Sequence, residues 1–283
     1  MTGHPEFNWG ISTLGCPELT LEALCTLAAS RDIHALEIRS LAGRMDLPAY
    51  FDEAFQSPGT VQAILDRYHQ QIISLNSSFT LISATEKDRN ELLEFARWAE
   101  ALSVPYIRIF GGGKITEPLS ADDLKRIAEN LNWWYDVRRQ KGWTTQVALE
   151  THSGFSSARR CLLLQEFAQQ PLDVVWDTHH TWKLGGESPW QSWDQFSHMV
   201  CLVQIKDSIS VPSGQHPYTY VLPGTGEFPA QEVFTLLKEN HYQGVLSLEW
   251  ERQWYPALPP IDQALDALVA NGWKNPAYGG ISS

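Results

Sequence analysis

Carboxylates stand at the ends of three apolar segments in the second half of the chain. Glu150 ends the run QVALE, Asp177 ends VVWD and Glu249 ends VLSLE. A carboxylate is costly to bury unless it is paired with a cation or bound to a metal ion. If the three segments are strands of one barrel, these side chains converge near its axis. Such an oxygen-rich group suits Mn²⁺, Mg²⁺ or Co²⁺, and Zn²⁺ becomes possible if a histidine joins it.

A buried network of ion pairs is a second interpretation of the same carboxylates. Arg108 and Lys206 lie near the ends of two other apolar segments and could supply the positive charges. The residue types are compatible with both interpretations, so the ion-pair network is kept beside the metal site.

Histidines follow two of these carboxylates. His152 lies two residues after Glu150, so both side chains point to the same side if the strand continues, and His152 is a candidate substrate contact. His179 and His180 face opposite ways if they continue an extended segment after Asp177. The Asp-x-x-His spacing lets the carboxylate hold an ion while the imidazole of His180 reaches a substrate. We therefore predict that His180 points into a pocket and that His179 is a polar surface group.

Short apolar runs alternate with longer amphipathic segments, and this alternation predicts the fold. The predicted strands are Asn8–Ser12, Ala35–Arg39, Gln71–Asn76, Tyr106–Phe110, Gln146–Glu150, Val174–Asp177, Leu202–Lys206 and Val245–Glu249. The predicted helices are Thr20–Arg31, Thr60–His69, Glu86–Leu102, Ala121–Lys141, Ser157–Gln169, Pro189–His198, Pro229–Asn240 and Ile261–Asn271. Apolar strands in strict alternation with helices indicate an α/β fold, a (β/α)8 TIM barrel, rather than an open sheet. Its active site is expected at the C-terminal ends of the strands.

Length and composition agree with one such domain over residues 1–283. A TIM barrel takes about 250 residues, and 43% of this chain is hydrophobic. The formal net charge of −12 argues against a general affinity for nucleic acid, because phosphate binding needs clustered Lys and Arg. The N-terminus MTGHPEFNWG lacks a secretory signal pattern, no apolar stretch approaches a membrane span, and no CxxC pair occurs. We expect a cytoplasmic protein without a membrane partner.

Three loops are expected to shape the substrate pocket. Leu41–Gly59 is a candidate lid, and Ser208–Glu227 is a second long loop, rich in Pro and Gly. Gly111–Gly113 either lets the backbone approach a ligand or is a bare turn. Four tryptophans near polar candidates suit a sugar pocket, with core packing as the alternative: Trp176, Trp182, Trp250 and Trp254.

The motifs VALETH, WDTHH, VQIKDS, LPGTGEF and SLEWE, in this order around the last four predicted strands, resemble the xylose isomerase-like TIM barrels. That group includes sugar isomerases and epimerases, inosose dehydratases and the more distant endonuclease IV. The resemblance covers most of the chain and is strongest from Gln146 to Trp254. In this family a Glu, an Asp, a His and a Glu from strands five to eight bind one divalent metal. The resemblance therefore implies Glu150, Asp177, Gln204 and Glu249 as ligands.

The strand-seven position departs from the family pattern, which has His-x-Lys-Asp where this chain has Gln204 before Lys206 and Asp207. A glutamine offers its carbonyl oxygen to a hard metal, but it is a weaker, neutral ligand. The expected cofactor is a divalent metal, Mn²⁺ first, with Mg²⁺, Co²⁺ or Zn²⁺ as alternatives. A weakened site, a water in the fourth position and loss of the metal are the other outcomes. The glutamine also argues against the endonuclease branch.

The resemblance implies an enzyme, a metal-dependent isomerase or epimerase of a keto sugar or related polyol derivative. The metal would polarise the carbonyl, and a proton would move through an enediolate. Glu150 and Glu249 are the predicted base and acid. The predicted substrate contacts are His180, Lys206, His152 and Arg108. Two alternatives stay open, a dehydratase of a keto-inositol or keto-sugar and a non-catalytic sugar-binding barrel. Barrels of this family often pair, so a homo-oligomer is expected.

Overall fold

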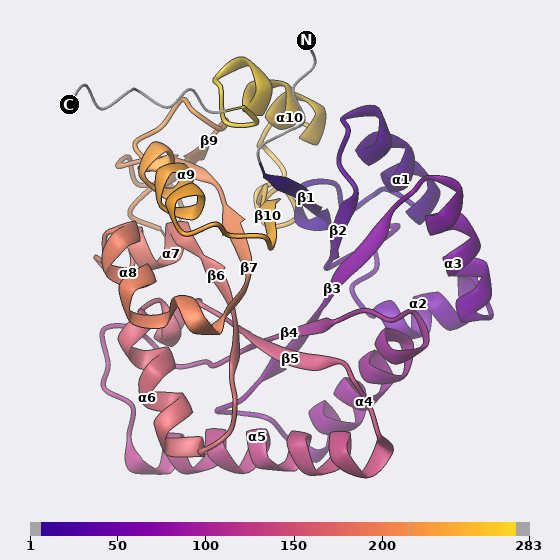
Figure 1. Ribbon diagram of the computed structural model, residues 1–283, viewed down its shortest axis with the longest axis vertical. Coiled ribbons are helices and arrows are strands. Elements are labelled where there is room, and N and C mark those ends of the chain that lie inside the picture. The colour runs from indigo at the N-terminus through magenta and orange to yellow at the C-terminus, as the bar shows by residue number, and fades with distance from the viewer. Residues whose placement is uncertain (1–6, 215, 276–283) are drawn as a thin grey trace.

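A closed barrel of eight parallel strands forms the centre of the molecule in the computed structural model, which describes residues 7–214 and 216–275. The strands follow one another around the barrel in the order β1-β10-β7-β6-β5-β4-β3-β2, with helices outside them (Figure 1). They are β1 Asn8–Ser12, β2 Ala35–Ile38, β3 Gln71–Thr80, β4 Tyr106–Phe110, β5 Gln146–Glu150, β6 Asp173–Asp177, β7 Val200–Ile205 and β10 Val245–Leu248. The predicted TIM barrel is confirmed.

Helices connect the strands and cover the outside of the barrel. They are α1 Leu21–Ser30, α2 Leu47–Ala54, α3 Pro58–Arg67, α4 Glu86–Ala101, α5 Ala121–Lys141, α6 Ala158–Ala168, α7 Thr178–Lys183, α8 Pro189–Phe196, α9 Ala230–Glu239 and α10 Ile261–Ala270. Side-chain caps fix several starts. Thr20 accepts from the backbone N–H of Ala23, and Ser120 forms a capping box with Asp123.

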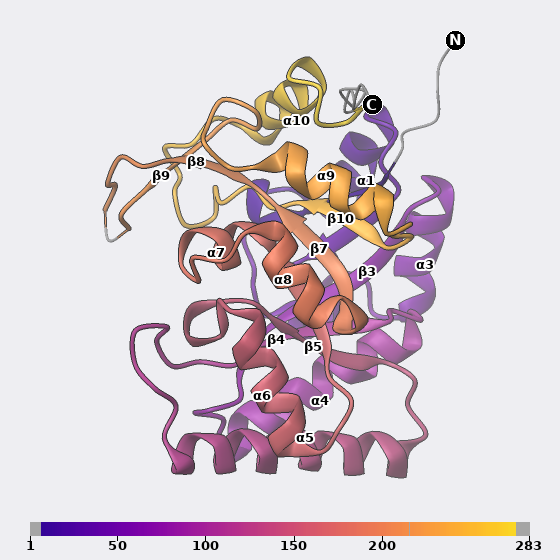
Figure 2. The same ribbon diagram turned by 60° about the vertical axis from the view of Figure 1, so that its left-hand side comes forward.

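Several short elements lie where the sequence predicts only loops. The candidate lid Leu41–Gly59 contains α2 and the start of α3, and α7 follows β6 directly. β8 (Asp207–Ile209) and β9 (Thr219–Val221) pair as an antiparallel hairpin, which extends beyond the barrel on the left of Figure 2. Segments this short show too little hydrophobic periodicity to be found from the pattern.

The core fills both the barrel and the layer between strands and helices. Trp176 and Trp250 are fully buried, so the core-packing alternative holds for these two tryptophans. Trp254 is about half exposed, at 51%. No helix in the described part of the chain is long and apolar enough to span a bilayer. The prediction that the chain lacks a secretory signal rests on its first ten residues. Of these, residues 1–6 lie outside the described residues.

Candidate functional site

A pocket of about 500 Å³ opens at the C-terminal ends of the strands, where TIM barrels carry their active sites. Its volume suits a small-molecule ligand. Its charged and imidazole side chains are Arg39, Arg108, Glu150, His152, His180, His216, Glu249 and Glu251. Its aromatic walls are Phe110, Tyr218, Tyr220, Trp254 and Tyr255. Ring faces beside hydrogen-bonding groups suit a sugar or polyol, which has both C–H faces and hydroxyls.

The ends of four strands bring the predicted metal ligands together. Glu150 and Asp177 are the last residues of β5 and β6, Gln204 lies in β7 beside Asp177, and Glu249 follows β10. All four are buried, at 2% exposure or less. Of these four, Glu150 and Glu249 line the pocket, whereas Asp177 and Gln204 do not.

Lys206 lies among these carboxylates. Its Nζ is 2.8 Å from Asp177 Oδ2 and 2.6 Å from Glu251 Oε1, and it also donates to Glu249 Oε2. Burial alone would lower the pKa of Lys206, but the three carboxylates outweigh burial and raise it. Lys206 is therefore an ammonium ion fully enclosed by protein, and it does not line the pocket as the predicted substrate contact would.

Arg108 forms the second buried ion pair, with its Nε 3.0 Å from Glu150 Oε2. Its guanidinium also lies over the Phe110 ring, 4.0 Å from the centroid, and donates to the backbone oxygen of Ser77. Burial raises the pKa of Glu150, while the charge of Arg108 acts in the opposite direction. The ion-pair network that the sequence left open is thus present, with Arg108 and Lys206 as its cations.

Gln204 acts as a hydrogen-bond donor to two carboxylates. Its Nε2 donates to Glu37 Oε1 at 2.6 Å and to Glu249 Oε1 at 3.1 Å. Glu37 also accepts from Asn76 and from Ser247, each at 2.7 Å. The amide orientation follows from this setting, because a carbonyl oxygen in place of Nε2 would face two carboxylate oxygens. Gln204 therefore couples the buried Glu37 to the pocket residue Glu249.

In this arrangement the four predicted ligands do not fit a divalent ion. The ammonium of Lys206 contacts two of their carboxylates, Arg108 occupies an oxygen of Glu150, and Gln204 presents N–H groups. A metal ion among them would have to displace Lys206 from a fully buried position. The four-ligand site stays a prediction from the family resemblance.

Burial and the charges around Lys206 shift the pKa values of two nearby carboxyl groups in opposite directions. Burial would raise the pKa of Asp177, but His180 and Lys206 outweigh it and hold that pKa well below its usual value. Burial raises the pKa of Glu249 well above its usual value, against the effect of Lys206, and nearby carboxylates add to the rise. The pKa values of Asp177 and Glu249 therefore move in opposite directions, although both carboxyl groups contact the same ammonium.

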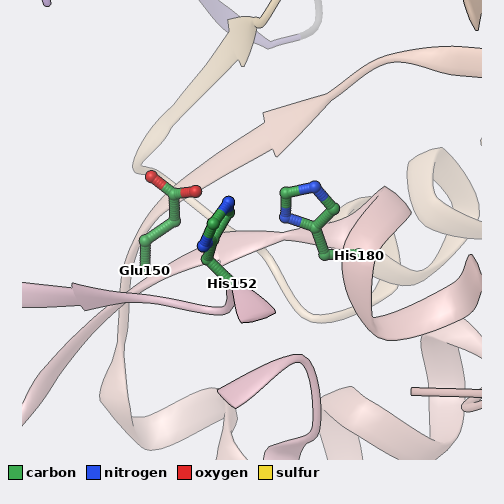
Figure 3. A group of neighbouring side chains, drawn as sticks. All are labelled: Glu150, His152 and His180. Atoms are coloured by element: carbon green, nitrogen blue, oxygen red, sulfur yellow. The ribbon is translucent and has the colours of Figure 1, made fainter. Parts of the chain in front are cut away.

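Two side-chain groups in the described residues have spacings that could hold a metal ion. They are Glu150 with His152 and His180, and Asp177 with His179 and His180. In each group the ligand atoms lie within 4.8 Å of one another. The first group lines the pocket, with Glu150 and His152 at the end of β5 and His180 on α7 (Figure 3).

Helix α7 changes the arrangement expected for the adjacent histidines. They lie on a helix because Asp177 Oδ1 accepts from the backbone N–H of His180 at 3.0 Å and caps it. His180 lines the pocket, as predicted. The prediction that His179 is a surface group is wrong: it is fully buried, and its Nε2 lies 2.7 Å from Ser208 Oγ. The His179 and Tyr218 rings meet edge to face with their centroids 5.0 Å apart, so His179 supports the aromatic wall.

Gly111, after β4, and Gly154, after β5, have no room for a side chain. A Cβ at Gly111 would lie 2.0 Å from the Phe155 ring, and a Cβ at Gly154 would lie 2.3 Å from the backbone oxygen of Gly112. The two segments therefore need glycine to pack together. This packing holds the short 3₁₀ helix Ser153–Phe155, which follows His152.

Asp207 ties the hairpin β8–β9 and the loop after it to the barrel. Its carboxylate accepts from the backbone N–H groups of Gly224 at 2.9 Å, Gly226 at 2.8 Å and Phe228 at 3.1 Å. The hairpin supplies the aromatic wall residues Tyr218 and Tyr220, so Asp207 positions part of the pocket.

Two charged residues that line the pocket, Arg39 and Glu251, were not predicted as site residues. Glu251 lies two residues after Glu249, and side chains at this spacing in an extended segment point to the same side. This spacing could have indicated that Glu251 lies in the pocket. Arg39 follows β2 and donates to Ser78 Oγ at 2.7 Å. Burial, with the neighbouring Arg108, lowers the pKa of Arg39 to about 10, so it stays charged at neutral pH.

Comparison with solved structures shows the same fold in proteins of low identity. A probable 3-DHS dehydratase, AsbF, from Bacillus anthracis has a TM-score of 0.74 at 17% identity, over 93% of this chain and 99% of that one. The IOLI protein, solved with a bound zinc atom, has a TM-score of 0.73 at 18% identity, over 94% and 96%. A D-allulose 3-epimerase from Methylomonas sp., solved with D-allulose, has a TM-score of 0.70 at 16% identity, over 97% and 99%.

A search of curated proteins finds no match. The family model described as xylose isomerase-like TIM barrel matches residues 26–270, which is most of the chain. The fold, the pocket at the C-terminal ends of the strands and this match agree with the resemblance seen in the motifs. The chain belongs to the xylose isomerase-like TIM barrel family.

Proposed function

We propose that this protein is an isomerase or epimerase that moves a proton on a keto sugar or a related polyol derivative. The observation that carries the proposal is the pair of buried carboxyl groups, Glu150 and Glu249, that line one pocket. They come from β5 and from the end of β10, which β6 and β7 separate in the ring of strands. Two such groups could act on different sides of a bound substrate, which a base and an acid must do to isomerise or epimerise it.

The two carboxyl groups differ in their surroundings, and this difference assigns their roles. Glu150 is paired with Arg108 and acts as the base that removes the proton next to the carbonyl. Glu249, whose pKa burial raises well above its usual value, is the acid that returns the proton. Arg39, Arg108 and His180 donate hydrogen bonds to substrate oxygens and stabilise the enediolate.

No step of this proposal is assigned to a metal at the four predicted ligands, because the Lys206 ammonium pairs with two of them, Asp177 and Glu249. The sequence still predicts Mn²⁺ for the family site, so the assay is run with chelator, with Mn²⁺ and with Zn²⁺.

Deuterium wash-in tests the proposal. The protein is incubated in heavy water with a panel of keto sugars and keto-polyols, and deuterium at the carbon next to the carbonyl is measured by NMR. We expect exchange together with formation of an isomer or epimer. If no compound on a broad panel exchanges under any of the three metal conditions, the proton-transfer proposal is wrong. Binding without exchange would support the non-catalytic sugar-binding alternative.

Dehydration of a keto-inositol or keto-sugar is a second candidate, favoured by a third carboxyl group in the pocket. Glu251 Oε1 contacts Lys206 and lies 3.4 Å from the Tyr220 hydroxyl. A lyase begins with the same enolisation and then needs an acid to protonate a leaving hydroxyl, and Glu251 could supply it. The mass of the product separates the two reactions, because a dehydratase product is lighter by one water.

A further inference from the structure

The Lys206 ammonium has the surroundings of a resident cation. An ammonium carries three hydrogen-bond donors, and Nζ contacts three carboxylates, those of Asp177 at 2.8 Å, Glu251 at 2.6 Å and Glu249. The Lys206 side chain is fully buried, and the centroid of the Tyr220 ring lies 5.6 Å from Nζ. Each donor therefore has an anionic partner, and the ammonium needs no water to satisfy it.

The contacted carboxylates come from two strands on either side of Lys206. Asp177 ends β6, whereas Glu249 and Glu251 follow β10. Lys206 follows β7, which lies between β6 and β10 in the ring of strands. The ammonium therefore joins the strand ends from which the family resemblance takes three of its four ligands.

Both oxygens of Asp177 and both oxygens of Glu249 already have partners. Asp177 Oδ2 contacts Lys206, and Asp177 Oδ1 accepts from the backbone N–H of His180 at 3.0 Å. Glu249 Oε2 contacts Lys206, and Glu249 Oε1 accepts from Gln204 Nε2 at 3.1 Å. A divalent metal would have to take these oxygens from the ammonium, and removal of one partner from a buried ion pair leaves a charge uncompensated. Ammonium and metal therefore compete for the same ligands.

Gln204 complements the ammonium rather than a metal. Its Nε2 has two N–H donors and no lone pair, and both donors are used, by Glu37 at 2.6 Å and by Glu249 at 3.1 Å. Glu37 fixes this orientation, because it also accepts from Asn76 and Ser247. A neutral histidine would instead offer a lone pair to a metal. Gln204 Oε1 has no hydrogen-bond partner among the described residues, but one neutral oxygen is a weak ligand.

The pocket group Glu150, His152 and His180 does not supply a free set of ligand atoms either. The His180 nitrogen that faces Glu150 and His152 is Nδ1 (Figure 3). This nitrogen lies 2.7 Å from Asp177 Oδ2 and 3.1 Å from the backbone oxygen of Thr151. A ring nitrogen that donates a hydrogen bond to such an oxygen has no lone pair left for a metal.

We propose that the Lys206 ammonium is the resident cation of this site and takes the place of a divalent metal ion. Gln204 stands where the family pattern has histidine, and it is the matching change because it gives Glu249 a donor instead of giving a metal a ligand. Lys206 is then a positioning residue that holds Glu249 and Glu251 at the pocket wall. The IOLI protein, which has the same fold, was solved with a bound zinc atom, so we infer that the two proteins differ in their cation.

Mn²⁺ binding by chelator-treated protein is the test, measured by isothermal titration and by the electron paramagnetic resonance signal of free Mn²⁺. Mn²⁺ is the probe because it suits carboxylate and carbonyl ligands. We expect no saturable binding by the unaltered protein. Its thermal unfolding temperature should be the same with chelator and with Mn²⁺, because an ion that bound only the folded state would raise it. The measurement is independent of which reaction the protein catalyses.

Removal of the ammonium should create the metal site that the unaltered protein lacks. Lys206→Met keeps a long side chain without the charge, and Gln204→His in the same chain completes the ligand set that the family resemblance implies. This double variant should bind one Mn²⁺ per chain, at least about 100-fold more tightly than the unaltered protein, since outer contacts alone change metal affinity by about 10–100-fold. Gln204→His alone should gain no binding, because the ammonium remains.

Two control variants separate the loss of this ammonium from the loss of any lysine. Lys183→Met removes the ammonium that pairs with Glu227 at 3.6 Å, and it should gain no Mn²⁺ binding. Lys206→Arg keeps a positive charge among the carboxylates and should gain none either. Far-UV circular dichroism without metal verifies folding of each variant.

Stoichiometric Mn²⁺ binding by the unaltered protein overturns the proposal, and this measurement decides alone if the double variant does not fold. The proposal is also overturned if the folded double variant binds Mn²⁺ no better than Lys183→Met. Tight binding by the double variant, with none by the unaltered protein or by Lys206→Arg, supports it.

Discussion

The two ends of the barrel each carry a cavity of similar volume, but they differ in charge. The cavity at the N-terminal ends of the strands has a volume of about 590 Å³, and the pocket at the C-terminal ends about 500 Å³. The residues that line the first include Gln70, Tyr106 and Leu202, and none of its lining residues is charged. The C-terminal pocket is lined by two arginines and three carboxyl groups.

Cavity size therefore does not identify the functional end of this barrel, and buried charge does. An apolar cluster of Ala35, Ile73, Ala148, Val175, Leu202 and Val245 packs as a separate part of the core. Apolar packing stabilises a fold without the desolvation cost of charges, whereas a buried ion pair often stabilises no more than apolar residues would. Among the described residues, the fully buried ion pairs are those of Lys206 and Arg108 at the C-terminal end, and chemistry at that end best explains their cost.

Loss of the proposed base should produce the largest effect. Glu150→Gln is expected to lower the deuterium exchange rate by about 10²–10⁴-fold, because it removes the group that accepts the proton. NMR of the exchanging carbon measures the rate, and thermal unfolding verifies that the variant is folded. An exchange rate equal to that of the unaltered protein would remove Glu150 from the reaction.

Loss of the buried ammonium should give the largest change in stability. Lys206→Met leaves Asp177, Glu249 and Glu251 without their cation and should lower the free energy of unfolding by about 3–5 kcal/mol. Gln70→Met is the comparison at the N-terminal end, where Gln70 donates to the backbone oxygen of Ile33 at 2.9 Å. Its expected cost is about 1 kcal/mol. Urea unfolding measures both, and equal losses would contradict the difference between the two ends.

Loss of the hairpin anchor should have a smaller effect, confined to the pocket wall. Asp207→Asn removes the charge that accepts from four backbone N–H groups, those of Ser208, Gly224, Gly226 and Phe228, and should cost about 1–3 kcal/mol. We expect a higher KM and faster proteolysis within residues 208–227. Glu227→Gln is the control, because Glu227 accepts from the backbone N–H of Ser210 in an exposed part of the same loop. A control as susceptible to protease as Asp207→Asn would remove the anchoring role from Asp207.

The smallest effect is expected at the uncharged end. Tyr106→Phe alters the N-terminal cavity, and burial raises the pKa of Tyr106 to about 12, so the substitution removes no charge at neutral pH. The free energy of unfolding should change by less than about 0.5 kcal/mol, and the exchange rate should stay the same. A large fall in exchange rate would place function at both ends.

The barrel could be predicted because its evidence is local and repeated. Apolar runs bounded by polar residues gave three strands, Asn8–Ser12, Tyr106–Phe110 and Gln146–Glu150, with the bounds that the structure shows. Glu150 and Glu249 could be placed at the pocket because strand ends meet at one end of a barrel.

The details of the site depend on contacts between distant segments, which spacing alone does not encode. Asp177 is followed by α7, whose first turn it caps, and this cap turns His179 into the protein. Lys206 is fixed by three carboxylates from other parts of the chain, and Gln204 by Glu37, which lies 167 residues away in sequence. Whether a carboxylate meets a metal ion or an ammonium ion is decided by such long-range packing.

Single-turnover deuterium exchange with Glu150→Gln and Tyr106→Phe, on one substrate identified on the keto-sugar panel, tests most directly whether the charged end of the barrel transfers the proton. We expect exchange in the unaltered protein and in Tyr106→Phe, with loss in Glu150→Gln. Exchange that survives in Glu150→Gln, or that is lost in Tyr106→Phe, would contradict the assignment of proton transfer to the charged end of the barrel.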